Sequence, residues 1–256
     1  MRSRLTAVIS LVLLLFSCDK IQENPLDPEG SDYTPPETFL AMEALEGAVL
    51  DTSTVTITWS GNDLVVEYAY SLNGDWSGWS ADTSVTLNYL DEGDYTFSVK
   101  GRYDSGDEDT TPDTVSFSVN MVGENGIRVF PLLTEMSTSA DVYIYAEDVD
   151  GLVFFSFQIQ FNSDSLSIDV EDIVRGSLIS GIAEYAFLPK EISAGLIEVS
   201  FTALGSAGVS GTGALVNLPF SATGSSTLQI INPQYGYING NIEPVTETAN
   251  GLVVVQ

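Results

Sequence analysis

Alternation of apolar and polar residues is the feature that most limits what this chain can fold into. In residues 55–59, Val55, Ile57 and Trp59 alternate with two threonines, and residues 155–161 alternate four apolar with three polar side chains. A period of two places successive side chains on opposite faces of a β-strand. No segment sustains the 3.6-residue period of an amphipathic helix. The sequence therefore predicts an all-β protein made of two β-sandwiches.

Turn signals divide the alternating segments into two groups. The first group, residues 42–121, has strand patterns at 55–59, 66–72, 85–89, 95–99 and 115–119, with an acidic turn at 91–94. We expect Trp59, Val66 and Tyr89 to point into its core. The second group, residues 124–256, includes strands at 142–146, 155–161, 195–201, 214–220, 227–231 and 252–255. Short strands separated by regular turns are typical of antiparallel sandwiches.

Charge and residue usage exclude several functions. The chain has 36 acidic and 8 basic residues, a net charge of −28, so it repels nucleic acid and we expect no nucleic-acid partner. It has no histidine and one cysteine, which removes Ser-His-Asp and Cys-His catalysis, imidazole metal sites and intrachain disulfides. We expect that the protein is not an enzyme and that it has no catalytic residues, no metal centre and no cofactor. A structural calcium ion is the alternative to the absence of a cofactor.

The first 17 residues have the layout of a secretory signal peptide. Arg2 and Arg4 precede an apolar run that is shorter than the roughly 20 residues of a transmembrane helix. The end of this run, Leu15-Phe16-Ser17-Cys18, resembles the lipobox of bacterial lipoproteins. The resemblance implies cleavage between Ser17 and Cys18 and lipidation of Cys18. The alternative is an ordinary signal peptide with an incidental cysteine.

Residues 18–41 are predicted to be an extended tether, since they combine four prolines with acidic and polar residues. The protein is then extracytoplasmic and attached to the bacterial cell envelope by its lipid. The outer membrane or cell surface is the favoured location. Asp19 resembles an inner-membrane retention signal, which leaves the inner membrane as the alternative.

The first group of strands resembles a known fold family. Residues 55–59, 68–79 and 90–99 are similar to a fibronectin type III domain and to the Tyr-rich Ig-like domain beside bacterial sensor propellers. The resemblance implies that Trp59 is a core tryptophan and that Tyr95 forms a tyrosine corner. It implies nothing specific about function, because such sandwiches have many roles.

The second group resembles a cohesin, a jelly-roll sandwich related to carbohydrate-binding modules. The resemblance rests on the order of five segments: Asp141–Tyr145, Gly151–Phe161, Val174–Leu178, Gly195–Phe201 and Gly211–Phe220. Asn162 and Ser165 depart from the Tyr and Pro usual in the family. The family usually binds a dockerin module of another protein through one sheet face. The contact residues lie outside the matching pattern, so no docking residue follows from it.

Four aromatic residues are candidates for stacking on a glycan: Trp76, Trp79, Tyr235 and Tyr237. Packing inside the sandwiches is the alternative for all four, and it is favoured. For calcium, the candidate is the acidic loop with Asp104, Asp107 and Asp109. A solvated loop is the favoured alternative.

Asp148-Val-Asp150-Gly151 has the appearance of an EF-hand loop. With Gly151 at the sixth position, Ala146 and Phe157 occupy positions one and twelve, where neither can ligate calcium through its side chain. We therefore interpret this segment as a plain acidic turn before a strand.

Three functions remain open from the sequence. The first is a membrane-anchored, non-enzymatic module that docks a dockerin-like partner, such as a polysaccharide-degrading enzyme, and it predicts a flat polar sheet face. The second is a carbohydrate-binding surface module, which predicts an aromatic strip or a groove. The third is a structural envelope protein, which predicts neither.

Overall fold

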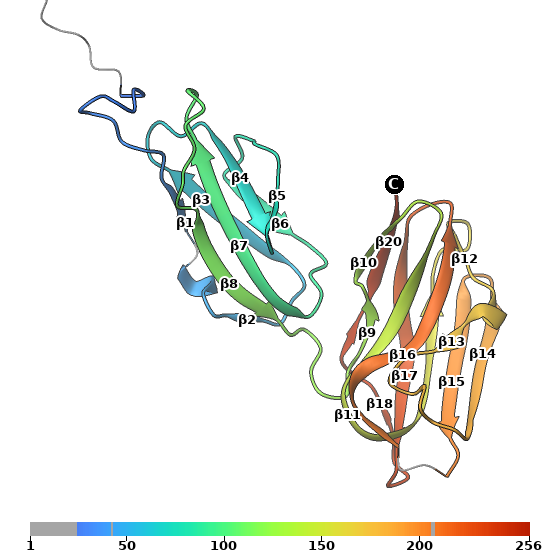
Figure 1. Cartoon of the computed structure of the whole chain (residues 1–256). Coiled ribbons are helices and arrows are strands. Elements are labelled where there is room, and N and C mark those ends of the chain that lie inside the picture. Colours follow the sequence, from blue (N-terminus) through green and yellow to red (C-terminus); the bar gives the residue numbers. More distant parts are fainter. Residues whose placement is uncertain (1–24, 42, 206–207) are drawn as a thin grey trace, which may run out of the picture. The chain divides into compact units, whose positions relative to one another are not determined.

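The computed structural model describes residues 25–41, 43–205 and 208–256 (Figure 1). Apart from two short 3-10 turns, Glu43–Leu45 (η1) and Val170–Asp172 (η2), the secondary structure of these residues consists of β-strands, which confirms the all-β prediction. The chain divides into two compact units, one within 1–43, 58–85 and 96–115 and the other within 44–57, 86–95 and 116–256. The predicted domain bounds stay predictions. Ser17, Cys18 and the rest of the predicted signal peptide lie outside the described residues.

Two sheets are formed between Thr38 and Val119. The smaller has the order β1-β3-β6, which are Thr38–Leu40, Val55–Gly61 and Ser84–Leu87. The larger has the order β2-β8-β7-β4-β5, which are Val49–Leu50, Asp113–Val119, Gly93–Arg102, Glu67–Leu72 and Asp75–Trp76. Strand β1 falls in the segment predicted as tether, residues 18–41. Thr38 is buried and pairs with Gly61, so the extended segment ends before it.

Aromatic side chains fill the space between these two sheets. Trp59 is buried, as predicted, and its ring centroid lies 6.0 Å from that of Tyr70 and 5.9 Å from that of Phe97. Tyr95 donates a hydrogen bond from its hydroxyl to the carbonyl of Asp91 at 2.8 Å, which confirms the predicted tyrosine corner. A buried aromatic centre of this kind is what alternating strands produce when both sheets turn their apolar faces inward.

Two predicted core residues are instead exposed. Val66 precedes strand β4, and Tyr89 follows strand β6 with a φ of 57°. Neither is held in the alternating geometry of a strand, so its place in the sequence pattern no longer fixes the face on which its side chain lies.

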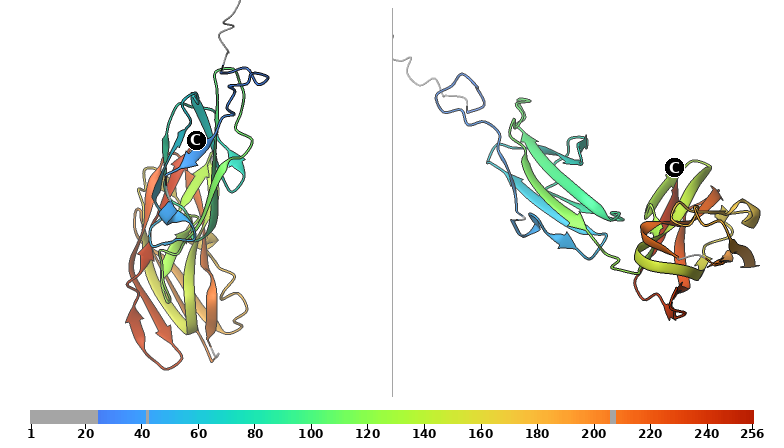
Figure 2. Two further views of the ribbon diagram at one scale, coloured as in Figure 1. Left: turned by 90° about the vertical axis from the view of Figure 1, so that its left-hand side faces the viewer. Right: turned by 60° about the horizontal axis from the view of Figure 1, so that its bottom comes forward.

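The strands between Ile127 and Val255 form a two-layered sandwich (Figures 1 and 2). Its strands are β9 Ile127–Phe130, β10 Leu133–Met136, β11 Ser139–Gln160, β12 Leu166–Ser167, β13 Val174–Arg175, β14 Tyr185–Ser193, β15 Leu196–Ala203, β16 Val209–Ala222, β17 Ser226–Tyr237, β18 Ile242–Pro244, β19 Thr248–Ala249 and β20 Gly251–Val255. One layer has the order β10-β20-β17-β11-β15-β14, and the other joins β19, β9, β11 and β16 with β12 and β13. Strand β11 belongs to both layers.

Strand β11 changes layer at a series of bulges near its middle. Its register against β16 shifts three times between Ile144 and Leu152, and Asp148 and Gly151 have φ angles of 42° and 69°. The predicted acidic turn at residues 148–151 is therefore wrong, because this segment stays within a bulged strand. Bulges bend a strand and increase its twist, so that one strand can serve two layers.

Two hydroxyl groups of β16 hold the bulged segment in place. The Thr212 hydroxyl accepts from the Asp148 backbone N–H and donates to the Asp148 carboxylate, both at 3.0 Å. The Ser210 hydroxyl accepts from the Gly151 N–H at 3.0 Å and donates to the Asp150 carboxylate at 2.7 Å. Each hydroxyl thus satisfies a backbone group that the bulge removes from the ladder.

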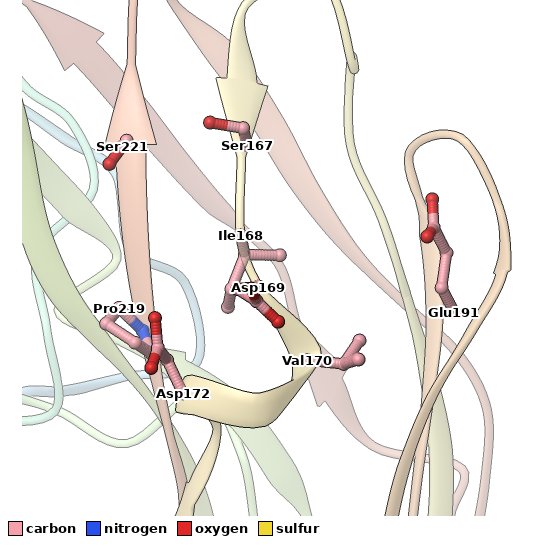
Figure 3. A pocket seen from close by; sticks show the side chains of 8 residues that line it. All are labelled: Ser167, Ile168, Asp169, Val170, Asp172, Glu191, Pro219 and Ser221. Carbon is pink, nitrogen blue, oxygen red and sulfur yellow. The ribbon is translucent and has the colours of Figure 1, made fainter.

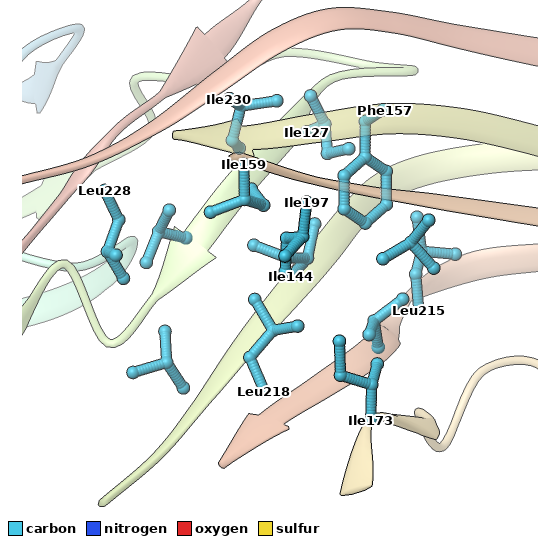
Figure 4. Packing of buried hydrophobic residues seen from close by; sticks show 14 of the residues in the cluster. Ile127, Ile144, Phe157, Ile159, Ile173, Ile197, Leu215, Leu218, Leu228 and Ile230 are labelled. Atoms are coloured by element: carbon cyan, nitrogen blue, oxygen red, sulfur yellow. The ribbon is translucent and has the colours of Figure 1, made fainter. Parts of the chain in front are cut away.

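Both halves of β11 supply the core of this sandwich (Figure 4). Val142 and Ile144 come from the half that pairs with β9 and β16, and Phe157 and Ile159 come from the half that pairs with β15 and β17. All four are fully buried. Burial of side chains of this size stabilises a fold by about 1.5–3 kcal/mol each.

The double variant Ser210→Ala/Thr212→Val tests the role of the bulge hydroxyls. We expect the free energy of unfolding to fall by about 1–2 kcal/mol, because two backbone N–H groups lose their partners at a solvent-exposed site. Urea unfolding measures the change. Ser221→Ala, an exposed serine on the same strand, is the matched control and should be neutral. An unchanged stability in the double variant would contradict this role.

Candidate interaction surface

The outer face of the layer that contains β14, β15, β11 and β17 carries two straight rows of side chains. The first row is Leu188, Ser200, Ser156 and Gln234, and the second is Lys190, Glu198, Gln158 and Ile231. Members of each row are paired across neighbouring strands. Phe155, Phe157 and Ile159 of β11 point inward, so their alternate neighbours must point outward. We call these eight residues the polar sheet face.

Hydrogen bonds connect the middle of the polar sheet face. The hydroxyls of Ser156 and Ser200 lie 2.9 Å apart, and the Gln158 amide donates to the Glu198 carboxylate at 3.1 Å. These two bonds link β11 to β15 by their side chains in addition to the backbone ladder. The face is therefore preorganised, and a partner that binds it does not have to order these side chains.

The edge strand β14 adds apolar and cationic groups to this face. Leu188 is 64% exposed, although it is a large aliphatic side chain within a strand. Lys190 is exposed, lies opposite Glu198 on β15 and makes no ion pair with a described residue. Leu188 can therefore offer an apolar contact to a partner, and Lys190 can offer a positive charge.

Lys190 differs from the other two cations in residues 124–256. Arg128 is buried and pairs with Glu147 at 2.6 Å. Arg175 donates to the carbonyls of Ile179 and Ile182 and lies 3.7 Å from the centroid of the Tyr185 ring. Both guanidinium groups are thus held by the protein. Among the described residues of this segment, Lys190 is the cation that remains available to a partner.

A cavity of about 520 Å³ lies beside η2, and acidic groups contribute to its lining (Figure 3). Asp169 and Asp172 come from η2 and its N-cap, and Glu191 comes from the neighbouring strand β14. The Asp169 carboxylate already accepts from the Glu171 N–H at 3.0 Å. Within the described residues, no group of three or more acidic, His or Cys side chains is arranged to hold a metal ion.

The four aromatic candidates for glycan stacking occupy different environments. Trp76 and Trp79 each lie 5.1 Å from the Lys100 ammonium, and Trp79 also lies 4.5 Å from the Arg102 guanidinium. These cation–π contacts occupy part of the surface that a sugar would use, and stacking at the two tryptophans stays a prediction.

Tyr235 and Tyr237 are held by their hydroxyl groups. Tyr235 is only 1% exposed and donates to the carbonyl of Gly126, which confirms the favoured prediction that it packs inside the sandwich and leaves it unavailable to a glycan. Tyr237 is half-buried and donates to Asn125 at 3.0 Å. The alternation with Gly236 did place both on one side of β17, but the core covers that side.

The three aspartates predicted as a calcium site are not brought together. Asp109 is buried and accepts from the N–H and hydroxyl of Thr111. Asp107 accepts from Ser105 at 2.8 Å, and Asp104 is exposed. The suggestion of calcium at Asp104, Asp107 and Asp109 therefore has no support from their geometry.

Sequence patterns missed the strand that gives the polar sheet face its apolar and cationic groups. Strand β14 places Phe187 inward and Leu188 outward, so two adjacent apolar residues hide the period of two. The available signal was the pair Leu188 and Lys190, separated by the spacing of one strand face.

No helix in the described part of the chain is long and apolar enough to cross a membrane.

Comparison with protein-family models gave no match, and comparison with curated proteins gave none either. Among solved structures, the chain is similar to a non-cellulosomal cohesin from Archaeoglobus fulgidus, with 20% identity and a TM-score of 0.43 over 52% of this chain and 92% of that one. It is also similar to a cohesin of scaffoldin B from Acetivibrio cellulolyticus, solved in complex with a Cel5 dockerin. Here the sequence identity is 18% and the TM-score is 0.46, over 52% of this chain and 100% of that one. For a cohesin module of a Clostridium perfringens family 33 glycoside hydrolase, the identity is 15% and the TM-score is 0.42, over 53% of this chain and 97% of that one.

The buried Tyr235 hydroxyl makes stability depend on alkaline pH. Burial, with smaller effects from Tyr237 and Glu147, raises the pKa of Tyr235 well above its usual value. The unfolded chain then loses this proton near pH 10 while the folded chain keeps it, so stability is full below about pH 10 and falls as pH rises further.

We expect Tyr235→Phe to lower stability at pH 7 by about 1 kcal/mol, since the Gly126 carbonyl loses one of its two donors and keeps only the Glu147 N–H, and to reduce the alkaline loss. Urea unfolding between pH 7 and 11 measures both effects. Tyr89→Phe, at an exposed position, is the control. An alkaline loss of the same size in Tyr235→Phe would show that another group causes it.

Proposed function

We propose that this chain is a lipid-anchored, non-enzymatic interaction module whose polar sheet face docks a dockerin-type module of another protein at the cell envelope. The observation that carries the proposal is the pair of ordered rows on this face, with exposed Leu188 and unpaired Lys190 at its edge. The cohesin-like sequence pattern of residues 141–220 supplies the kind of partner. That partner is expected to bind calcium in duplicated Asp-rich loops.

The face fits the docking hypothesis better than its two alternatives. It is polar and preorganised by hydrogen bonds, as the docking hypothesis predicts. None of the eight residues that define it is aromatic, which disfavours an aromatic sugar-binding strip there. A purely structural envelope protein gives no reason to keep a large aliphatic side chain and an unpaired cation exposed on one strand.

Charge specifies the chemistry of the partner. In a chain with a net charge of −28, an available lysine is the group that can attract an acidic residue. Leu188 lies one row away and offers an apolar contact beside that ion pair. The expected contact surface on the partner therefore combines a carboxylate with an apolar side chain.

The lipid would determine where this docking occurs. A diacylglyceryl group on Cys18 and an acylated amine together hold a protein stably on a membrane, since each buried methylene contributes about 0.8 kcal/mol. The acidic protein surface gives no electrostatic attraction to anionic lipid headgroups. Anchoring in the bacterial envelope, with the outer membrane or cell surface favoured, would therefore depend on the lipid alone.

Two substitutions on β14 test the docking surface. The full chain is immobilised and exposed to the organism's secreted proteins, first with calcium and then with a chelator. We expect a calcium-dependent partner whose own sequence carries duplicated Asp-rich loops. Lys190→Glu and Leu188→Asp should each weaken its binding at least tenfold, about 1.4 kcal/mol, because one reverses the charge and the other removes the apolar contact.

Val174→Asp provides the matched control for Leu188→Asp. Val174 is another exposed aliphatic residue, but it lies on β13 in the other layer. It should leave binding unchanged. Equal losses in all three variants would place the docking surface elsewhere, and a partner without calcium-dependent binding would contradict a dockerin-type module.

The lipid anchor is tested by Cys18→Ser. We expect the unaltered protein to incorporate labelled fatty acid and to fractionate with membranes, and the variant to do neither, because the sulfur that carries the diacylglyceryl group is absent. Fatty-acid labelling followed by membrane fractionation measures both. A variant that is still labelled would exclude Cys18 as the site.

A further inference from the structure

One groove of this sandwich contains no charged side chain. It has a volume of about 460 Å³ and lies where β11 ends and β17 begins. Its lining residues are Gln160, Phe161, Asn162, Ser225, Ser226, Thr227 and Gln229. A volume of this size is within the usual range for small-molecule sites. The groove therefore has room for a ligand of a few rings.

The absence of charge in this groove is unusual for so acidic a chain. Residues 199–242 contain no Asp, Glu, Lys or Arg, although the chain has 36 acidic residues. This uncharged stretch includes β16, β17 and the connection between them, and the groove residues from 225 onward belong to it. A cationic ligand would find no carboxylate here, and an anionic ligand would be repelled by the net charge of the protein. The chemistry of the groove thus favours a neutral ligand.

Three polar side chains of the groove are available for hydrogen bonding, whereas Asn162, Ser225 and Ser226 already bond to backbone groups. Gln160 and Gln229 are exposed, face each other across β11 and β17, and make no side-chain hydrogen bond within the described residues. Thr227 is exposed in the same way. A side-chain amide offers two donors and an acceptor, so two facing glutamines can bind adjacent hydroxyl groups of one ligand.

The groove is also lined by Phe161, which anchors it to the core. Phe161 is half-buried, and its ring meets Phe220 edge-on, with centroids 5.1 Å apart and an angle of 77°. This packing against the core fixes the position of the ring. The ring thus holds the end of β11 in place, and the facing amides beside it provide hydrogen bonds for hydroxyl groups of a ligand.

We infer that this groove binds a neutral oligosaccharide, at a site distinct from the four aromatic residues considered from the sequence. Gln160 and Gln229 would bind the hydroxyl groups of the sugar rings. The inference is independent of the proposed docking function, because it rests on the groove and not on Leu188 or Lys190.

The test uses the full chain in a detergent without a sugar headgroup, since a glycosidic detergent would compete for the groove. Cellohexaose and xylohexaose are the neutral probes, and an oligogalacturonate of similar length is the anionic one. Saturation-transfer NMR detects binding, and calorimetry measures affinity. We expect transfer to at least one neutral probe and none to the anionic probe. No transfer to either neutral probe at millimolar concentration would overturn the inference.

Variants then locate the site. Gln160→Ala and Gln229→Ala should each weaken binding of the neutral probe about fivefold or more, through loss of hydrogen bonds. Gln234→Ala removes another exposed glutamine of β17 that lies outside the groove, and it should leave the affinity unchanged. Binding that resists all of these changes, or that is lost equally in Gln234→Ala, would place the sugar elsewhere.

Discussion

The continuity of strand β11 through both layers is the constraint on which the C-terminal sandwich depends. One unbroken strand, Ser139–Gln160, pairs with β9 and β16 in one layer and with β15 and β17 in the other. It can do so only because the bulged segment near Asp148 and Gly151 bends it, with help from two hydroxyls of β16. A straight strand of this length would leave one half of its apolar residues without a facing layer.

The candidate surface follows from the same strand. Once Phe155, Phe157 and Ile159 enter the core, the alternation of the strand places Ser156, Gln158 and Gln160 on the outside. The cross-strand registers of β15 and β17 then fix which residues lie beside them. The polar sheet face and the groove are therefore consequences of how the core is packed, and they inherit its rigidity. A shift by one residue in β11 would bury polar groups and expose phenylalanines, which strongly opposes any other register.

The sequence predicted the features that depend on strong local alternation and missed those that depend on tertiary context. Trp59 and residues 155–161 were placed correctly because several alternating residues agree on one face. Strand β14 escaped detection because Phe187 and Leu188 are adjacent apolar residues on opposite faces. The segment around Asp148 reads as a turn, and only its partners Ser210 and Thr212, about sixty residues away in the chain, reveal a bulge. The burial of Tyr235 likewise depends on the distant carbonyl of Gly126.

The two proposed binding regions are adjacent on one sheet, and this has a consequence for how they would operate. The Gln160 pair lies two residues along β11 from the Gln158 row, a separation of about 7 Å. A protein partner of ordinary size covers about 800 Å² on each side, which extends far beyond a single row. A module docked over Leu188 and Lys190 and centred on the sheet would therefore reach the groove and exclude an oligosaccharide from it. Docking and sugar binding on this sheet would compete, and a free oligosaccharide would then weaken the attachment of the partner.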